Sequence, residues 1–230
     1  MNARVVIIIG PIGAGKGTQS DILADSFGML HVETSKFLEE RFKSGGSDPK
    51  MIEEKAKWGS GVLNDPEWVT QVVIDKVTQL ATEGKSLVFS SSPRTLYETE
   101  REMPVLESLF GRENVLIINI LLSEAESIKR NSGRRICQLR HPIPNFPENA
   151  KLTHCPKDGT PLERRELDKP DVIKVRYGEY VTRTEPILKF LSERGYEVLP
   201  VNGEQSIEAV AEDILKHLQV HHQGAPTPIS

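Results

Sequence analysis

The sequence predicts an α/β fold: a doubly wound, parallel, five-stranded sheet with helices on both faces and one inserted subdomain. Short apolar runs rich in Val and Ile, typical of strands buried on both faces, alternate with longer segments of helical periodicity. The other observation is a stretch from about Ile136 to Arg164 that lacks sustained periodicity and contains five prolines. It is too long for an ordinary connection, so we expect a small subdomain between two helices.

Four apolar runs indicate strands. Arg4–Ile9 (RVVIII) is the first, and it leads directly into a glycine-rich turn. Ser86–Phe89 (SLVF) and Val115–Leu122 (VLIINILL) follow, and Tyr196–Val201 is a weaker pattern for the last strand of the five.

The helices between these runs have recognisable start signals, a capping residue followed either by proline or by a glutamate three residues later. These signals stand at Asp48-Pro49, Asp65-Pro66, Thr95-x-x-Glu98 and Ser123-x-x-Glu126. A helix over Gln19–Phe27 follows the glycine-rich turn, and a last helix with one apolar face covers Ile207–Leu218.

Composition narrows the class of protein. The 230 residues carry a formal net charge of −4, which does not favour nucleic-acid binding, and the two cysteines fit a reducing compartment. The longest apolar run is too short to span a bilayer, and the N-terminus does not have the pattern of a signal peptide. We expect a soluble cytoplasmic protein with no nucleic-acid or membrane partner, and a disordered tail over residues 221–230.

The glycine-rich turn Gly10–Thr18 (GPIGAGKGT) matches G-x-x-x-x-G-K directly between a predicted strand and a predicted helix. Glycines let successive backbone N–H groups turn inward on phosphate oxygens, and the helix N-terminus adds its dipole. Lys16 would reach the outer phosphates. The sequence therefore predicts nucleotide binding by Gly13, Ala14, Gly15, Lys16, Gly17 and Thr18.

Position 17 is Gly, where the general loop has Ser or Thr directly after the lysine. The resulting Gly-Lys-Gly-Thr-Gln is a family signature, and with it the chain resembles the adenylate kinases, P-loop nucleoside monophosphate kinases, in their long-lid form. Ser92-Pro93-Arg94-Thr95 stands where that family has F-P-R-T, and Arg130–Ile136 (RNSGRRI) resembles its R-x-x-G-R-R-x. The resemblance covers roughly residues 4 to 218.

The resemblance implies a kinase core of residues 1–135 and 165–220, a helical monophosphate-binding segment of about 33–64, and a lid of 136–164. It implies reversible transfer of a phosphoryl group from ATP with magnesium to AMP. The chain should be a monomer, because the lid and the monophosphate segment must both move.

Phosphoryl transfer depends on positioning and on positive charge around the travelling group, which explains the many arginines. Arg165 and Arg176, eleven residues apart, resemble the arginines that clamp the phosphates, and Asp168 matches one acid of the family's R-x-D-D. The resemblance implies catalytic roles for Lys16, Arg94, Arg134, Arg165 and Arg176. It adds Arg130 and Arg134 to the ATP site, and it places at the acceptor Thr34, Lys36, Leu63, Ser91, Arg94, Glu98, Arg165 and Arg176.

Three departures from the family pattern bear on the magnesium and acceptor sites. Ser90 stands where the family has an Asp that helps to hold the magnesium shell, and Glu39 replaces an arginine that meets the monophosphate. Lys36, one turn earlier on the same face, would supply the missing charge. Glu98 replaces a Gln that reads the adenine edge, and it either closes a capping box with Thr95 or reads another base. An ATP-binding relative with CMP, UMP or no acceptor is therefore the second interpretation, and a kinase of a non-nucleotide acceptor is the third.

Both cysteines lie in the predicted lid, in Cys137-x-x-x-His141 and Cys155-x-x-Asp158. Some adenylate kinases hold zinc there with two C-x-x-C pairs, or with Asp in the last place, so these four residues are candidate zinc ligands. His154 is a spare candidate. The alternatives are a hydrogen-bonded polar cluster without metal and a disulfide between the cysteines.

Overall fold

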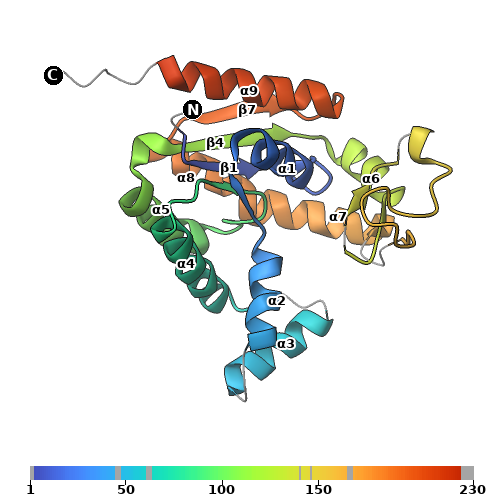
Figure 1. The fold of residues 1–230 in the computed structure, drawn as a ribbon, viewed down its shortest axis with the longest axis horizontal. Helices are drawn as coiled ribbons and strands as arrows, with labels where there is room; N and C mark the ends of the chain where they lie inside the picture. The colour runs from blue at the N-terminus through green and yellow to red at the C-terminus, as the bar shows by residue number, and fades with distance from the viewer. Residues whose placement is uncertain are drawn as a thin grey trace.

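The computed structural model describes residues 3–44, 48–60, 64–139, 141–145, 147–164 and 168–223, and it confirms the α/β fold (Figure 1). The central sheet is entirely parallel, with the strand order β2-β3-β1-β4-β7. Its strands are β1 (Val5–Ile9), β2 (Leu30–Val32), β3 (Leu87–Phe89), β4 (Val115–Leu121) and β7 (Val198–Asn202).

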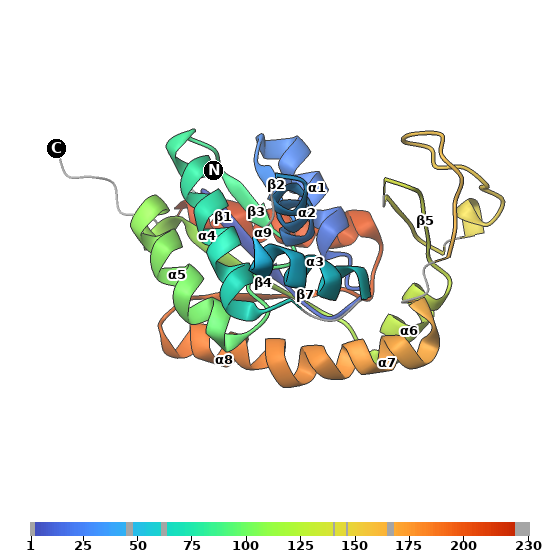
Figure 2. The same cartoon turned by 90° about the horizontal axis from the view of Figure 1, so that it is seen from below.

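Helices cover both faces of this sheet. One face packs against α4 (Pro66–Thr82), α5 (Leu96–Phe110) and α8 (Glu185–Glu193). The other packs against α1 (Lys16–Phe27) and α9 (Ile207–Gln223). Figure 2 shows α1 and α8 on opposite sides of the strands.

The side chains of β1 divide between these two layers, because successive residues of a strand point to opposite faces. Val5, Ile7 and Ile9 belong to the core under α4, α5 and α8, whereas Val6 and Ile8 belong to the core under α1 and α9. All five are buried, as the continuous apolar run predicts.

Two helices project away from the sheet, α2 (Thr34–Ser44) and α3 (Pro49–Ser60) (Figure 1). They share a small apolar core with the start of α4, in which the ring of Phe42 lies 5.6 Å from that of Trp68 and 6.0 Å from that of Trp58. The buried carboxylate of Glu54 accepts the backbone N–H of Asp65 at 2.9 Å, which ties α3 to the start of α4.

The predicted insertion lies between α6 (Glu124–Ser132) and α7 (Pro170–Glu179), at the opposite end of the molecule from α5 (Figures 1 and 2). Among its described residues it contains the short antiparallel strands β5 (Arg135–Ile136) and β6 (Pro142–Ile143) and one 3-10 turn, η2 (Pro147–Asn149). Its small core is built around Cys137, Ile143 and Cys155.

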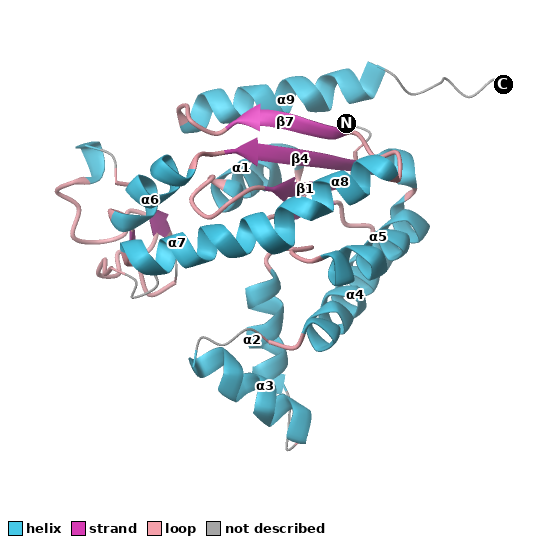
Figure 3. Ribbon diagram, turned by 180° about the vertical axis from the view of Figure 1, so that it is seen from behind, coloured by secondary structure: helices cyan, strands magenta, loops and turns pink. Residues whose placement is uncertain are grey.

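Three features were not predicted by the patterns in the sequence or differ from the prediction. The apolar pattern does not predict β2, whose three residues (LHV) run from exposed to buried. A π-helical turn, η4 (Tyr180–Thr184), joins α7 to α8 so that the three form one long rod (Figure 3). The predicted tail is wrong at its start, because α9 continues to Gln223, and the remaining residues 224–230 lie outside the described part of the chain.

Several local predictions are confirmed. The side chain of Asp65 accepts the N–H groups of Glu67 and Trp68 at the start of α4. Thr95 caps α5 and Ser123 caps α6 in the same way.

Another 3-10 turn, η1 (Arg112–Asn114), precedes β4. In the part of the chain that the structure describes, the helices all fall short of the length and apolar character needed to cross a membrane.

Candidate functional site

The phosphate loop (Gly10–Thr18) joins the end of β1 to the start of α1. Gly13 and Gly15 have φ angles of 82° and 85°, which side chains rarely allow. A Cβ atom on Gly13 would also lie 2.3 Å from the Asn131 amide nitrogen. Helix α1 begins at Lys16 with no side-chain cap, so its first N–H groups, together with those of the loop, are suited to bind a phosphate.

Helix α6 braces this loop from behind, through residues that the motif did not indicate. Ser127 donates its hydroxyl to the carbonyl of Ile12 at 2.7 Å, and Asn131 lies against Gly13. Both polar side chains are buried, one helical turn apart. The helix has only two apolar residues, Ala125 and Ile128, so no hydrophobic pattern in the sequence marked this buried face.

Positive charge gathers at Lys16. Its ammonium group donates to the carbonyls of Gly10 and Pro11, at 2.7 and 2.8 Å. Burial, followed by repulsion from the guanidinium groups of Arg94, Arg176 and Arg134, lowers the pKa of Lys16 to about 7. Four of the five predicted catalytic residues, Lys16, Arg94, Arg134 and Arg176, therefore lie close enough together to interact electrostatically.

Asp168 holds the arginines on the lid side. Its buried carboxylate accepts two hydrogen bonds from Arg134, at 3.0 and 2.7 Å, and lies 4.0 Å from Arg176. A bidentate pair of this kind fixes the plane of a guanidinium group. Arg165, the fifth predicted catalytic residue, lies outside the described residues.

Two other arginines of the lid entrance make local contacts. Arg130, predicted at the ATP site, pairs with Glu126 on its own helix, with 3.0 Å between Nε and Oε1. Arg135 donates to the carbonyls of Asn149 and Leu152, so it holds the lid segment together through backbone oxygens.

The predicted acceptor residues meet where β2 and β3 end. The Ser91 hydroxyl accepts the backbone N–H of Thr34 at 3.1 Å, and the Ser91 carbonyl accepts Nε of Arg94 at 2.6 Å. Lys36 is well exposed, and its ammonium group lies 2.9 Å from a carboxylate oxygen of Glu33. Leu63 lies outside the described residues, and Glu39 is half-buried on α2.

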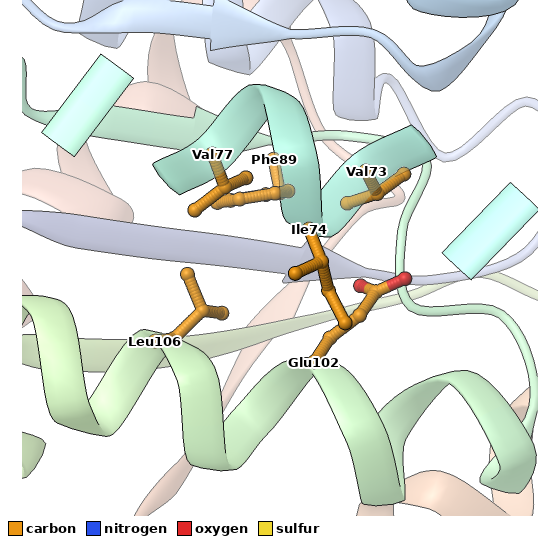
Figure 4. Close-up of a pocket in the computed structure, with 6 residues that line it drawn as sticks. All are labelled: Val73, Ile74, Val77, Phe89, Glu102 and Leu106. Atoms are coloured by element: carbon orange, nitrogen blue, oxygen red, sulfur yellow. The ribbon is translucent and has the colours of Figure 1, made fainter. Parts of the chain in front are cut away.

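Two glutamates of α5 lie beneath this loop. Glu98 accepts the backbone N–H of Arg94 at 2.6 Å, and its own N–H is capped by Thr95. Glu102 accepts the Ser92 hydroxyl and is buried among α4, α5 and β3 beside a small cavity (Figure 4). Burial raises the pKa of both carboxyls, and for Glu102 the rise is large.

The four candidate zinc ligands converge in the lid. Their donor atoms on Cys137, His141, Cys155 and Asp158 all lie within 4.8 Å of one another. An Asp158 oxygen is 3.0 Å from Sγ of Cys137 and 2.9 Å from Nδ1 of His141. Both cysteines are buried and free, so no disulfide joins them. The exposed His154 instead contacts Thr153.

The sequence of this chain matches a known protein family. Residues 8–196 match the family profile described as adenylate kinase. The chain is 31% identical to the adenylate kinase of Kosmotoga olearia over 218 residues, 93% of this chain and 98% of that protein. It is 32% identical to that of Chlamydia pneumoniae over 212 residues, 92% and 96% of the two chains. For that of Methanocella arvoryzae the identity is 29% over 212 residues, 90% and 95%.

Proposed function

The chain belongs to the adenylate kinase family, and we propose that it transfers the terminal phosphoryl group of ATP, bound with magnesium, to AMP. As a member of this family it is a nucleoside monophosphate kinase, a phosphotransferase that uses ATP. The observation that carries the proposal is the gathering of Arg94, Arg134 and Arg176 around Lys16. Such cations offset the charge that spreads over the phosphoryl oxygens in the transition state.

On the donor side, the N–H groups of residues 13–18 bind the ATP phosphates and Lys16 donates to the outer ones. Arg134 and Arg165 hold these phosphates from the lid side, and Arg130 packs on the donor base. Magnesium, when bound, neutralises part of the phosphate charge. The bidentate contact with Asp168 supports this role for Arg134, because it fixes the guanidinium group at the lid entrance.

On the acceptor side, Arg94 and Arg176 hold the monophosphate. The contacts of Ser91 with Thr34 and with Arg94 support this grouping. Glu98 lines the acceptor pocket as a structural cap, because its carboxylate already accepts a backbone N–H. The full acceptor pocket that we propose consists of Thr34, Lys36, Leu63, Ser91, Arg94, Glu98, Arg165 and Arg176.

A second candidate function is ATP binding with weak or altered acceptor activity, either toward CMP or UMP or toward no acceptor at all. The charge on the acceptor side favours weak or absent activity in particular: Lys36 is paired with Glu33, so it is only partly able to compensate for Glu39. An acid near the monophosphate weakens binding of any acceptor phosphate.

A coupled assay with ATP, magnesium and each of AMP, CMP, UMP and GMP separates these candidates. We expect AMP to give the highest kcat/KM, and the Arg94→Ala variant to lose most of it. Lys189→Met, which removes a well-exposed cation on α8, is the matched control and should leave the rate unchanged. ATP binding without turnover on AMP would refute the proposal.

We also propose that Cys137, His141, Cys155 and Asp158 bind a structural zinc ion. Donor atoms around a tetrahedral zinc stand about 3.5 Å apart, given bonds of about 2.0 to 2.3 Å. The separations here, 2.9 Å to 3.5 Å for the three pairs that touch, are close to that geometry. The insertion has only a small core, so a metal ion would supply stability that its packing lacks.

Elemental analysis of protein purified without a histidine tag tests the zinc site. We expect close to one zinc per chain, lost in Cys155→Ser and kept in His154→Ala, the matched control from the same segment. Less than about 0.1 zinc per chain, with a melting temperature that a strong chelator leaves unchanged, would show that the four residues form only a hydrogen-bonded cluster.

We further infer that residues 136–164 act as a lid and residues 33–64 as a monophosphate-binding segment, both moving on the core of residues 1–135 and 165–220 of a monomer. Small-angle X-ray scattering should give the mass of one chain and a smaller radius of gyration with ATP and AMP together. A stable dimer, or no compaction, would contradict this inference.

A further inference from the structure

A chain of hydrogen bonds connects α1, β2 and the end of β3. The Asp21 carboxylate lies 2.8 Å from Nδ1 of His31, and Nε2 of His31 lies 2.7 Å from the Ser90 hydroxyl. The partners are 10 and 59 residues apart in the sequence, so no local turn forces them together. Ser90 is buried, and the His31 side chain is only 10% exposed.

The direction of these hydrogen bonds follows from the chemistry of the groups. An ionised carboxylate only accepts, so the proton of a neutral His31 ring is on Nδ1 and points to Asp21. Nε2 is then an acceptor, and the Ser90 hydroxyl must donate to it. The lone pairs of the Ser90 oxygen remain available, and the charge of Asp21 polarises them through the ring.

Ser90 stands at the carboxyl end of β3, next to the strand that leads into the phosphate loop. It directly follows Phe89, which pairs with Ile7 of the neighbouring strand β1, and β1 leads into the loop at Gly10. Ligands of parallel sheets bind at this carboxyl edge of the strands. Enzymes with a phosphate loop commonly use an acidic residue to hold the magnesium ion of the nucleotide. In this chain, an uncharged hydroxyl stands in that position, with a carboxylate two hydrogen bonds behind it.

We propose that Asp21 and His31 are positioning residues that orient the Ser90 hydroxyl as an acceptor for a water molecule of the magnesium ion bound with ATP. The inference rests on the proposed use of ATP with magnesium. By this arrangement, the Asp21 carboxylate would influence the water molecules around the magnesium ion through His31 and Ser90, although residue 90 is not itself an acid. Partners behind a metal ligand commonly change metal affinity by about tenfold or more.

The same cluster is less suited to bind a metal ion directly. Ligand atoms of Asp21, His31 and Glu33 lie within 4.8 Å of one another. However, the ammonium group of Lys36 is 2.9 Å from Glu33 and already balances its charge. The Nδ1 proton of His31 also points at Asp21, so the ring has no lone pair on that side for a metal.

The variant that tests the proposal is Asp21→Asn, which keeps the shape of a half-exposed side chain. Asn removes the charge that polarises the ring, and an amide whose NH2 group faces Nδ1 also moves the ring proton to Nε2 and reverses the hydrogen-bond chain. Asp25→Asn, an exposed acid on the same helix, is the matched control. Nitrogen-15 NMR of the imidazole reports the tautomer, and calorimetry with and without magnesium reports how much the metal strengthens ATP binding.

We expect the unsubstituted chain to carry its proton on Nδ1. In Asp21→Asn, the gain in ATP affinity on adding magnesium should fall about tenfold, with affinity in the absence of magnesium unchanged. In Asp25→Asn the gain should stay the same. In the double variant Asp21→Asn with Ser90→Asp, a carboxylate at residue 90 acts directly, so the gain should return.

A proton on Nε2 in the unsubstituted chain, or equal behaviour of the Asp21→Asn and Asp25→Asn variants toward magnesium, would overturn the inference while leaving the kinase proposal intact. Magnesium binding without nucleotide that disappears in Asp21→Asn would also overturn it, in favour of a direct metal site. A chain that does not bind ATP at all would overturn both proposals.

Discussion

Lys16 should make ATP binding depend on pH. Its pKa is about 7, against an ordinary value of 10.5, because of burial and the nearby Arg94, Arg176 and Arg134. Phosphates beside the ammonium group raise this pKa again, so a lysine that is neutral in the free protein takes up a proton on binding. We expect uptake of about 0.5 proton per ATP at pH 7 and about 0.9 at pH 8, and a Kd for ATP that rises about tenfold from pH 6 to pH 8.

Calorimetry in buffers of different ionisation enthalpy counts these protons directly. Lys16→Arg is the control, because its guanidinium group keeps the charge but does not titrate in this range. The phosphates of ATP titrate alike with both proteins, so the difference between them isolates Lys16. Equal proton uptake by the two proteins at pH 8 would refute the reasoning.

Three further predictions concern residues around the site. Asp168→Asn weakens the paired hydrogen bonds to Arg134 and should lower the free energy of unfolding, measured by urea titration, by about 2 kcal/mol. An unchanged free energy of unfolding would show that the pair does not stabilise the protein. Burial raises the pKa of Glu102, so above about pH 4.5 the unfolded chain ionises this carboxyl more readily than the folded protein, and stability falls as pH rises. The melting temperature of Glu102→Gln should match that of the unsubstituted protein at pH 4 and exceed it at pH 8. A lower melting temperature at both pH values would contradict this. Gly13→Ala places a Cβ 2.3 Å from an amide nitrogen at positive φ and should weaken ATP binding more than about tenfold in calorimetry, while Gly178→Ala, with open space around it, should not.

Local features were predicted well from the sequence. The run RVVIII and the following glycine motif indicated β1, the phosphate loop and α1, because burial on both faces and positive φ angles restrict residue type within a few positions. The caps at Asp65, Thr95 and Ser123 were likewise predictable, since a side chain there reaches N–H groups only two or three residues away.

Strand β2 shows where such reasoning stops. Three residues are too few to establish a period, and only the pairing of Leu30, His31 and Val32 with β3 makes them a strand. The beginning of the predicted tail was wrong for a related reason: composition suggested disorder, but α9 packs on the sheet and continues to Gln223.

The contacts that matter most for the candidate site depend on the tertiary structure. The spacing of Cys137, His141, Cys155 and Asp158 indicated two short pairs, but only the fold of the insertion brings the pairs together. The fold likewise decides that Asp168 gathers arginines from both sides of the insertion. Residue type and spacing act over a few positions, so they determine strands, turns and caps. Which distant side chains meet is decided by strand order and helix packing, because these bring together residues that are far apart along the chain.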